Sequence, residues 1–389
     1  MIQAMFVLTG TVTTLLGPIL PVLVAWWGLD DAEAGLLFTL QFAGSMSGSA
    51  LSSVAMTRLG FRPTLVIGNG LMAAGVGALG WGVQSVGSVS VFCYGVGLGL
   101  TIPATNLVVA ETHPATRASA LNLLNLAWGL GAVAGPPVVA LFQRTNDVDL
   151  FLYLLAGALA LTATVIGWTV PAGGAQRTPE GTGIAAPSGA PRAQVLLFGA
   201  MLFIYVGTET SLAGWLAVYA RRIDLMSAAA ASAAPAIFWT GLLLGRASAP
   251  LILRRVTEVR LLVCGLLVAA ASVLILLGAR SPAALVTAVI LGGLGLSTIF
   301  PISVALFTRD LGEAASRSAG PVFVLAALGG ATLPSLVGVV SSRTGSLTAG
   351  LVIPLVGCVS MLGLQRWRSQ HSQRTIGLVP DHQSDAHLG

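Results

Sequence analysis

The sequence predicts an all-α membrane protein with twelve transmembrane helices in two six-helix bundles. Three observations lead to this fold class: the chain is strongly apolar, its apolar runs have the length of membrane spans, and its second half repeats features of the first. Of the 389 residues, 55% are hydrophobic and only 8% are charged, and the mean hydropathy is +0.88. Because a soluble domain carries about a quarter charged residues, we expect a lipid bilayer to surround most of this chain.

The apolar runs set the number of expected spans. A helix needs about 20 apolar residues to cross the roughly 30 Å of hydrocarbon in a bilayer. Charged residues, prolines and glycines divide the chain into twelve such runs. The expected spans of the first half are 4–27, 35–56, 64–83, 89–110, 118–142 and 150–170. Those of the second half are 194–220, 228–253, 261–277, 282–307, 321–340 and 348–364.

The segment between the sixth and seventh runs divides the chain nearly in half. Residues 171–193 are rich in Gly, Pro, Ala and Thr and predict a flexible cytoplasmic linker. The predicted domains on either side are 1–170 and 194–364, each a six-helix bundle. Residues 365–389 are expected to form a polar cytoplasmic tail.

The two halves repeat a motif of small residues followed by proline. Gly-Leu-Gly-Leu at 97–100 leads to Pro103, and the same four residues at 293–296 lead to Pro301. An offset near two hundred residues is expected of two parallel repeats. Pro103, Pro301 and Pro18 lie inside expected spans, where each would interrupt the backbone hydrogen bonds of its helix.

The arginines predict which side of the membrane each loop occupies. With a cytoplasmic N-terminus, thirteen loop and tail arginines face the cytoplasm and five face the opposite side. This asymmetry places both termini in the cytoplasm, and Asp30, Asp31 and Glu33 then cluster in the first outer loop. We expect a monomer in the inner (plasma) membrane. The arginines form no basic stripe, so we expect no nucleic-acid partner.

The sequence lacks the residue patterns of an enzyme. It has no phosphate-binding glycine loop followed by Lys-Thr or Lys-Ser. Cys93, Cys264 and Cys358 fall singly in apolar runs, without the spacing of metal ligands. We therefore expect no catalytic activity, no cofactor and no metal.

The loop after the second run resembles a family signature. It reads Ser-Val-Ala-Met-Thr-Arg-Leu-Gly-Phe-Arg. The major facilitator superfamily has Gly-x-x-x-Asp-Arg-x-Gly-Arg/Lys-Arg/Lys at this place. Arg58, Gly60 and Arg62 match, whereas Ser53 and Thr57 replace the glycine and the aspartate. The resemblance implies the twelve-span fold of that superfamily and a gating loop at Arg58, Gly60 and Arg62.

Three further segments are similar to the fucose-permease-like branch of this superfamily. They are GLGLTIPATN at 97–106, LNLLNLAWGLGA at 121–132 and YVGTETSLAGWLAVY at 205–219. The proton-coupled fucose permease carries carboxylates in its first and fourth spans, and here Gly17 and Ile102 stand at the corresponding places. The resemblance implies a sugar permease but does not transfer that coupling scheme.

Glu209 is the one acidic residue deep inside an expected span. An ionisable group at mid-bilayer costs at least ~2.5–3.5 kcal/mol on insertion scales and normally faces a cavity or a partner. Tyr205 lies one helical turn earlier on the same face. We predict that both side chains bind the solute and that Glu209 accepts a coupling proton. A structural hydrogen bond from Glu209 to a neighbouring helix is the alternative.

Four amides are candidate ligands for the solute. Asn106, Asn122 and Asn125 lie at the depth where the superfamily holds its ligand, and Gln41 in the second span is a weaker candidate. Asn122 and Asn125 are three residues apart and share a helix face. An amide both donates and accepts hydrogen bonds, which suits a polyol. Amides also join transmembrane helices, with a contribution of about 0.6 kcal/mol each.

Three tryptophans inside spans are candidates for stacking on a sugar ring. Trp128 lies one turn beyond Asn125, and Trp215 and Trp239 fall in the seventh and eighth spans. An indole ring can contact the apolar C–H face of a sugar, although packing between helices is an equal alternative. Arg246, expected near the cytoplasmic third of the eighth span, either snorkels toward water or anchors the second half's gating loop.

These features together predict a permease for a small polar solute, with a sugar or polyol favoured. The two halves would rock around a site near the midplane, driven by protons through Glu209 or by the solute gradient alone. Two alternatives stay open: a proton-driven exporter of amphipathic drugs or metabolites, and a membrane sensor that binds a solute without transporting it.

Overall fold

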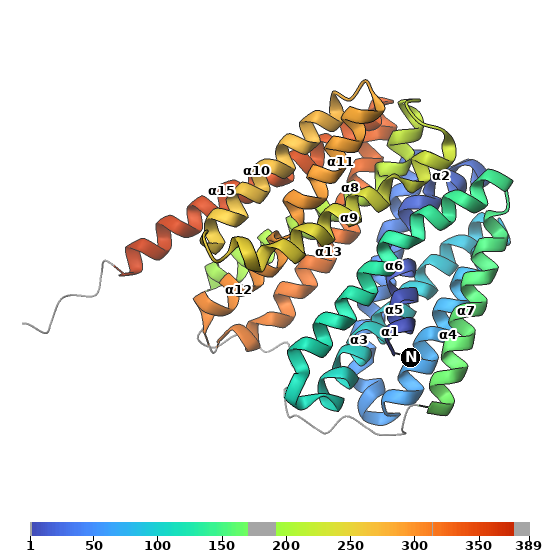
Figure 1. The fold of residues 1–389 in the computed structure, drawn as a ribbon, viewed down its shortest axis with the longest axis horizontal. Helices are drawn as coiled ribbons and strands as arrows, with labels where there is room; N and C mark the ends of the chain where they lie inside the picture. Colours follow the sequence, from blue (N-terminus) through green and yellow to red (C-terminus); the bar gives the residue numbers. More distant parts are fainter. Residues whose placement is uncertain (1, 170–191, 313, 377–389) are drawn as a thin grey trace, which may run out of the picture.

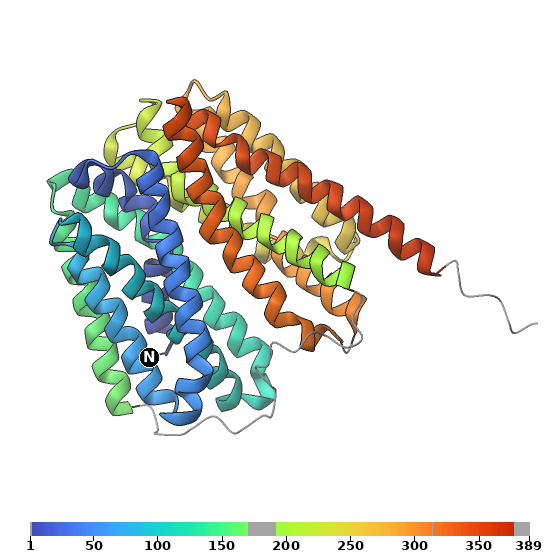
Figure 2. The same cartoon turned by 180° about the vertical axis from the view of Figure 1, so that it is seen from behind.

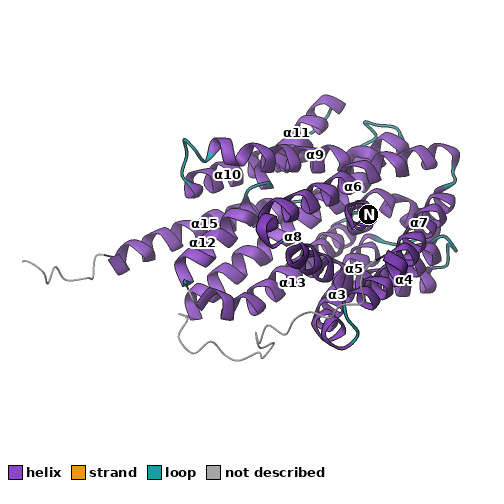
Figure 3. Ribbon diagram, turned by 60° about the horizontal axis from the view of Figure 1, so that its bottom comes forward, coloured by secondary structure: helices purple, strands orange, loops and turns teal. Residues whose placement is uncertain are grey.

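Helices account for the regular structure throughout the residues that the computed structural model describes, 2–169, 192–312 and 314–376 (Figure 3). The first half contains α1 (Ile2–Thr13), α2 (Leu16–Trp27), α3 (Asp31–Arg58), α4 (Phe61–Leu79), α5 (Gln84–Thr112), a short 3₁₀ turn (Pro114–Thr116), α6 (Arg117–Thr145) and α7 (Val148–Thr169). The second half contains α8 (Arg192–Arg222), α9 (Ala228–Ile252), α10 (Glu258–Leu277), α11 (Pro282–Leu296), α12 (Ile299–Leu311), α13 (Ala314–Thr344), α14 (Leu347–Gly350) and α15 (Val352–Ile376).

Every expected apolar run coincides with one helix or with two helices in succession. Nine helical stretches of the described chain are long and apolar enough to cross a membrane, and α1 with α2, bent by 46°, makes a tenth if the pair is one span. α3 and α4 are not among them, so the count of twelve spans stays a prediction. The expected linker, 171–193, lies outside the described residues except for its last two positions, which begin α8.

The helices form two bundles inclined to each other (Figures 1 and 2). Helices α1 to α7 pack mainly on one another, and so do α8 to α15. The bundles meet where α2, α3 and α6 of the first contact α8, α9 and α13 of the second. Figure 1 shows them joined at the upper end, where α3 begins and α8 ends. We call this end the seam face and the other end the opposite face.

Two of the expected prolines break their helices. Proline has no N–H group to bond the carbonyl four residues earlier. Pro18 therefore frees the carbonyl of Thr14, and the chain breaks between α1 and α2 at that point. Pro301 likewise frees the carbonyl of Ser297, between α11 and α12. Pro103 stays within the unbroken α5.

A buried carboxylate joins the bundles at the seam face. Asp31, at the first turn of α3, accepts hydrogen bonds from both terminal nitrogens of Arg222, one at 2.7 Å, and from the hydroxyl of Ser341 on α13. The carboxylate side chain is 8% exposed. A charge-assisted pair with two parallel N–H bonds fixes orientation as well as contributing energy. Asp31 therefore holds the first bundle to both α8 and α13.

Small residues continue this contact along α3 and α13. Thr39 donates to the carbonyl of Ala331 at 2.6 Å, and Ser335 donates to the carbonyl of Gly35 at 2.7 Å. A Cβ atom on Gly338 would lie 2.1 Å from the carbonyl oxygen of Asp31, so only glycine permits this approach. We call this set of contacts between α3 and α13, with Arg222, the seam.

Asp31 lies outside the expected span 35–56, and its ionisation decides when the seam holds. Burial raises the pKa of the Asp31 carboxyl group, but the hydrogen bonds from Arg222 and Ser341 and the charge of Arg222 outweigh burial and bring the pKa below its ordinary 3.8. A lowered pKa contributes stability that is present above the unfolded pKa and is lost as pH falls through the folded one. The Asp31 carboxyl group is therefore ionised at neutral pH and available to pair with Arg222.

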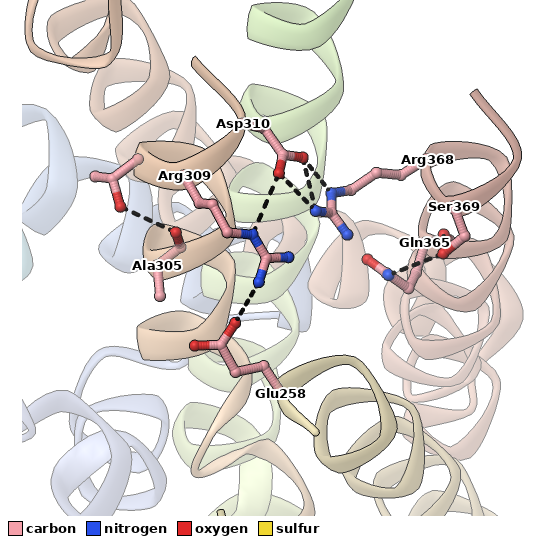
Figure 4. Close-up of polar contacts among 8 residues, drawn as sticks. Glu258, Ala305, Arg309, Asp310, Gln365, Arg368 and Ser369 are labelled. Atoms are coloured by element: carbon pink, nitrogen blue, oxygen red, sulfur yellow. Dashed lines mark hydrogen bonds and ion pairs between the residues drawn. The ribbon is translucent and has the colours of Figure 1, made fainter. Parts of the chain in front are cut away.

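A second group of charges lies wholly within the second bundle (Figure 4). Arg368 of α15 donates to both oxygens of Asp310 on α12, at 2.7 and 2.8 Å, and lies over the ring of Phe198 on α8 at 5.8 Å. Arg309 bonds Glu258 of α10 at 3.1 Å. Because all of these partners belong to one bundle, they need not separate when the two bundles move. The pair of Arg368 and Asp310 also explains why α15 continues past residue 364, where a polar tail was expected. Arg368 is buried against Asp310 and holds this part of the helix to α12.

Replacing Asp31 with asparagine is expected to loosen the seam. The variant loses the charge of a pair in which Arg222 is 42% exposed, so solvent screening limits the cost to about 1 kcal/mol. A cysteine in place of Ser341, which is buried beside Asp31, in a variant without the three native cysteines, should then react about fivefold faster with a membrane-impermeant maleimide than the same cysteine beside native Asp31. The matched control is Asp149→Asn, an exposed carboxylate at the start of α7. An unchanged labelling rate in Asp31→Asn would contradict the role given to the seam.

Candidate functional site

A cavity of about 140 Å³ lies between the two bundles. Residues of α1, α2, α3 and α6 line it from the first bundle, and residues of α8 and α9 line it from the second. The lining consists of Thr13, Thr14, Leu16, Gly17, Phe38, Gln41, Phe42, Trp128, Val206, Glu209, Thr210, Ala213, Gly214 and Trp239. Four of the nine predicted binding residues are therefore brought together: Gln41, Trp128, Glu209 and Trp239.

Glu209 faces this cavity with two partners. The hydroxyl of Tyr205, one turn earlier on α8 and 1% exposed, donates to Glu209 Oε1 at 2.7 Å. Arg246 Nη2 on α9 lies 3.8 Å from the same oxygen. The Glu209 side chain is 16% exposed, so one carboxylate edge is held while the group stays open to the cavity. The ring of Tyr205 is buried against Phe300 and does not line the cavity. Tyr205 therefore contributes to the site only through its hydrogen bond to Glu209.

Arg246 points into the second bundle. Its Nε donates to the carbonyl of Ser297 at 3.3 Å, the carbonyl that Pro301 leaves without a helical partner. The freed carbonyl and the Glu209 carboxylate together hold the guanidinium beside the cavity. A role of Arg246 in the second half's gating loop stays a prediction.

Two tryptophans cross the boundary between the bundles. The rings of Trp128 on α6 and Trp239 on α9 pack edge to face, with centroids 5.6 Å apart at 87°. Trp128 Nε1 donates to the hydroxyl of Thr13 at 3.3 Å, and Phe238 packs on the other side of Trp239. These rings provide an apolar wall on which the C–H face of a polyol can rest.

Gln41 lines the cavity, and its side chain also bonds the backbone at the break between α1 and α2. Its Nε2 donates to the carbonyl of Thr13 at 2.9 Å, and its Oε1 accepts from the hydroxyl of Tyr94 at 3.1 Å. An amide has two N–H donors, so one N–H remains for a solute. The side chain is 6% exposed.

The other predicted binding residues lie away from the cavity lining. Asn106 Nδ2 donates to the carbonyl of Ile102 on its own helix at 2.9 Å. Trp215 is fully buried and donates to the carbonyl of Pro334 at 2.9 Å, so its ring packs between helices and does not meet a solute. Asn122 and Asn125 are exposed on α6, on the face that carries Trp128.

The expected gating loop forms the turn between α3 and α4. Gly60 has φ +90°, a conformation that favours glycine. The side chains of Arg58 and Arg62 form no ion pair with a described residue. The turn is therefore as expected, while a gating role for the two arginines stays a prediction.

Sequence reasoning missed the threonines and phenylalanines that complete the lining. Thr13 and Thr14 precede Pro18 by one helical turn, and the proline was the available signal, because the residue four before a proline has a free carbonyl. Phe38 and Phe42 flank Gln41 on α3, but nothing in an apolar run distinguishes a phenylalanine that faces a cavity from one that faces lipid.

Two bundles of apolar helices around a shared central cavity define the class of α-helical membrane transporters. The family model of the Major Facilitator Superfamily matches residues 4–332, so this chain belongs to that superfamily. An uncharacterized MFS-type transporter of Yersinia pestis is 23% identical over 368 residues, which cover 92% of this chain and 91% of the relative.

Solved structures share the fold at low sequence identity. The nucleoside transporter NupG superposes with a TM-score of 0.75 at 14% identity, over 94% of this chain and 97% of NupG. The fucose:proton symporter FucP of E. coli superposes with a TM-score of 0.59 at 19% identity, over 94% of this chain and 97% of FucP. At such identity these likenesses show the fold alone.

Removing the hydroxyl of Tyr205 should affect exchange of solute, because it deprives Glu209 of its short hydrogen bond. Tyr205→Phe is expected to lose about 1 kcal/mol of stability and to slow solute exchange in proteoliposomes. Tyr219→Phe is the matched control, since Tyr219 is also buried on α8 and donates to the carbonyl of Leu276 at 2.9 Å, away from the cavity. Thermal unfolding in detergent should shift alike for both. Equal exchange rates in the two variants would argue against the Tyr205–Glu209 pair as part of the site.

Proposed function

We propose that this protein is a secondary transporter that moves a small polar solute, a sugar or polyol, by alternating access to the central cavity. The observation that carries the proposal is the pairing of one carboxylate, Glu209, with the ring pair Trp128–Trp239 in a cavity shared by both bundles. Alternating access requires a site that both bundles build, because each bundle must carry its part of the site as it rocks.

The chemistry of the lining favours a hydroxylated solute. The indole rings offer apolar walls, and Thr13, Thr210 and Gln41 offer hydroxyl and amide groups around them. FucP, whose fold this chain shares, is a fucose:proton symporter. A sugar or polyol presents C–H faces and hydroxyls in alternation and so matches both kinds of lining.

Glu209 is the group through which we propose proton coupling. It is the one ionisable residue among those that line the cavity, and its partners are Tyr205 and Arg246. A proton on the carboxylate would cancel its charge and weaken the attraction to Arg246. A solute that binds only one protonation state would then move together with the proton.

We propose further that α3 and α4 also cross the membrane, which makes twelve spans with both termini in the cytoplasm. α3 lies against α5 and α13, and α4 lies against α5 and α7. Because a helix rises about 1.5 Å per residue, the 19 residues of α4 extend about 28 Å, close to the thickness of the hydrocarbon. In this orientation the seam face is the outer face, and the protein is a monomer of the inner (plasma) membrane.

The orientation is tested by labelling single cysteines on either side of α4. Leu59, before α4, should be cytoplasmic and Val83, after it, should be outside; both are exposed. In a variant without native cysteines, an impermeant maleimide on intact cells should label Val83→Cys at once and Leu59→Cys only after permeabilisation. Glu33→Cys, in the first turn of α3, should behave as Val83→Cys does. Labelling of Leu59→Cys and Val83→Cys from the same side would rule out α4 as a span.

The transport proposal is tested by counterflow of a radiolabelled sugar and polyol panel in proteoliposomes. Exchange needs no driving force, so Glu209→Gln should still exchange the solute, whereas an imposed proton gradient should drive accumulation only by the native protein. Glu258→Gln is the control, because Glu258 is a partly exposed carboxylate bonded to Arg309 outside the cavity.

Three results would contradict part or all of this proposal. Accumulation by Glu209→Gln equal to the native protein would exclude the coupling role. Exchange of amphipathic aromatic compounds in place of sugars would favour a drug exporter, for which the ring-lined wall is also suited. Saturable binding without any exchange would indicate a sensor.

A further inference from the structure

Arg246 is a cation beside the cavity. A neutral sugar would form no ion pair with it. A guanidinium carries five N–H donors. Its Nε donates to the carbonyl of Ser297, and the hydroxyl of Tyr205 is a second polar neighbour of the guanidinium, which leaves donors unused. The nearest carboxylate oxygen, on Glu209, is 3.8 Å from Nη2 and beyond hydrogen-bond reach. The side chain is 38% exposed, so the terminal nitrogens are accessible to a ligand.

The backbone around Arg246 holds this cation in place. Pro301 supplies the free Ser297 carbonyl that accepts from Nε, and Gly245 lets α9 approach: a Cβ at Gly245 would lie 2.1 Å from the Ser297 hydroxyl. A cation within a span is costly unless it has a partner or a function. The position of Arg246 is therefore built into the helix break and is not the result of a side chain drifting toward water.

Arg246 lies beyond the lining residue Trp239 on α9, toward the opposite face. Trp239, Leu243 and Arg246 are spaced four and three residues apart, so they share one face of α9, and Arg246 lies about 10 Å beyond Trp239 along the helix. Leu243 contacts Gly129 on α6. One turn before Gly129, toward the opposite face, Asn125 is exposed on α6. The cation and the amide thus lie on facing helices, beyond the lining residues of the cavity and toward the opposite face.

The balance of charge decides what kind of solute fits. With Glu209 ionised, its charge and that of Arg246 cancel. Once Glu209 takes up a proton, the positive charge of Arg246 remains without a carboxylate of the protein beside it, and an anion becomes the favoured partner of the partly exposed guanidinium. Tyr205 is the other titratable partner of Glu209 and only donates a hydrogen bond, and Glu209 forms no second ion pair with the described residues of the helices around α8. A neutral solute would leave the charge uncompensated.

We propose that Arg246 binds a carboxylate group of the solute, so that the transported solute is a polyhydroxy monocarboxylic acid. The inference rests on the proposed transport function and names its substrate class. A proton binds Glu209, and the carboxylate of the solute takes over as the partner of Arg246. The hydroxyl-bearing carbons then lie along the amide of Asn125 and the rings of Trp128 and Trp239. The site has zero net charge both empty and loaded, so proton and anion cross together without net charge movement.

The test is counterflow of matched pairs, each an aldonic acid and its parent aldose, across several carbon skeletons. The native protein should exchange at least one acid about tenfold faster than its aldose. Arg246→Gln should lose acid exchange about tenfold or more, as expected for a lost charge-assisted pair, and Arg246→Lys should restore part of it. Arg144→Gln, an exposed arginine at the end of α6, is the control and should match the native protein.

A second variant and a second readout keep the test decisive if Arg246→Gln does not fold. Glu209→Gln mimics the protonated carboxylate, so its acid exchange should persist and no longer depend on pH. Currents on a solid-supported membrane should be absent when acid and proton move together in the native protein. Exchange of aldoses without acids would overturn the inference and leave the transport proposal standing, and exchange of neither would overturn both.

Discussion

The buried carboxylate of Asp31 is the interaction on which the rest of this structure depends. It is held by Arg222 and Ser341, and the glycine contacts along α3 and α13 bring the two bundles close enough for that bond to form. The charge group of Glu258, Arg309, Asp310 and Arg368, by contrast, bonds only within the second bundle. Motion between the bundles therefore needs one seam to open, and nothing in the charge group of Asp310 and Arg368 opposes it.

Two features shape the surroundings of the cavity: the helix breaks at Pro18 and Pro301, and the separated charges of Glu209 and Arg246. Pro18 and Pro301 each free a carbonyl, and the second of these, on Ser297, holds Arg246 beside Glu209. At a separation of 3.8 Å the charges of Glu209 and Arg246 attract each other without a direct hydrogen bond. A proton can therefore neutralise Glu209, and an anion can pair with Arg246. If Glu209 and Arg246 were directly hydrogen-bonded, both the proton and the anion would bind less readily.

The sequence predicted the helical fold, the family and a carboxylate that the structure places in the lining of the cavity, because these rest on composition, motif and burial cost. Glu209 was found since a carboxylate in an apolar run requires an explanation. The approach of Arg246 to Glu209 could not be predicted, because Arg246 belongs to another helix and is held by the Ser297 carbonyl, a contact that depends on the fold. Trp215 was predicted to bind the solute, but its ring is buried between helices. Residue spacing along α8 could not reveal this, because it does not show which neighbouring helix covers an indole ring.

The measurement that tests the central claim most directly is a pair of distance distributions from spin labels. One pair, at Glu33 and Ser342, spans the seam; the other, at Arg62 and Arg254, spans the opposite face. If the bundles rock as units around the cavity, Asp31→Asn should lengthen the first distance and shorten the second in the same fraction of molecules. Lengthening at the seam with no change at the opposite face would contradict alternating access by rigid bundles.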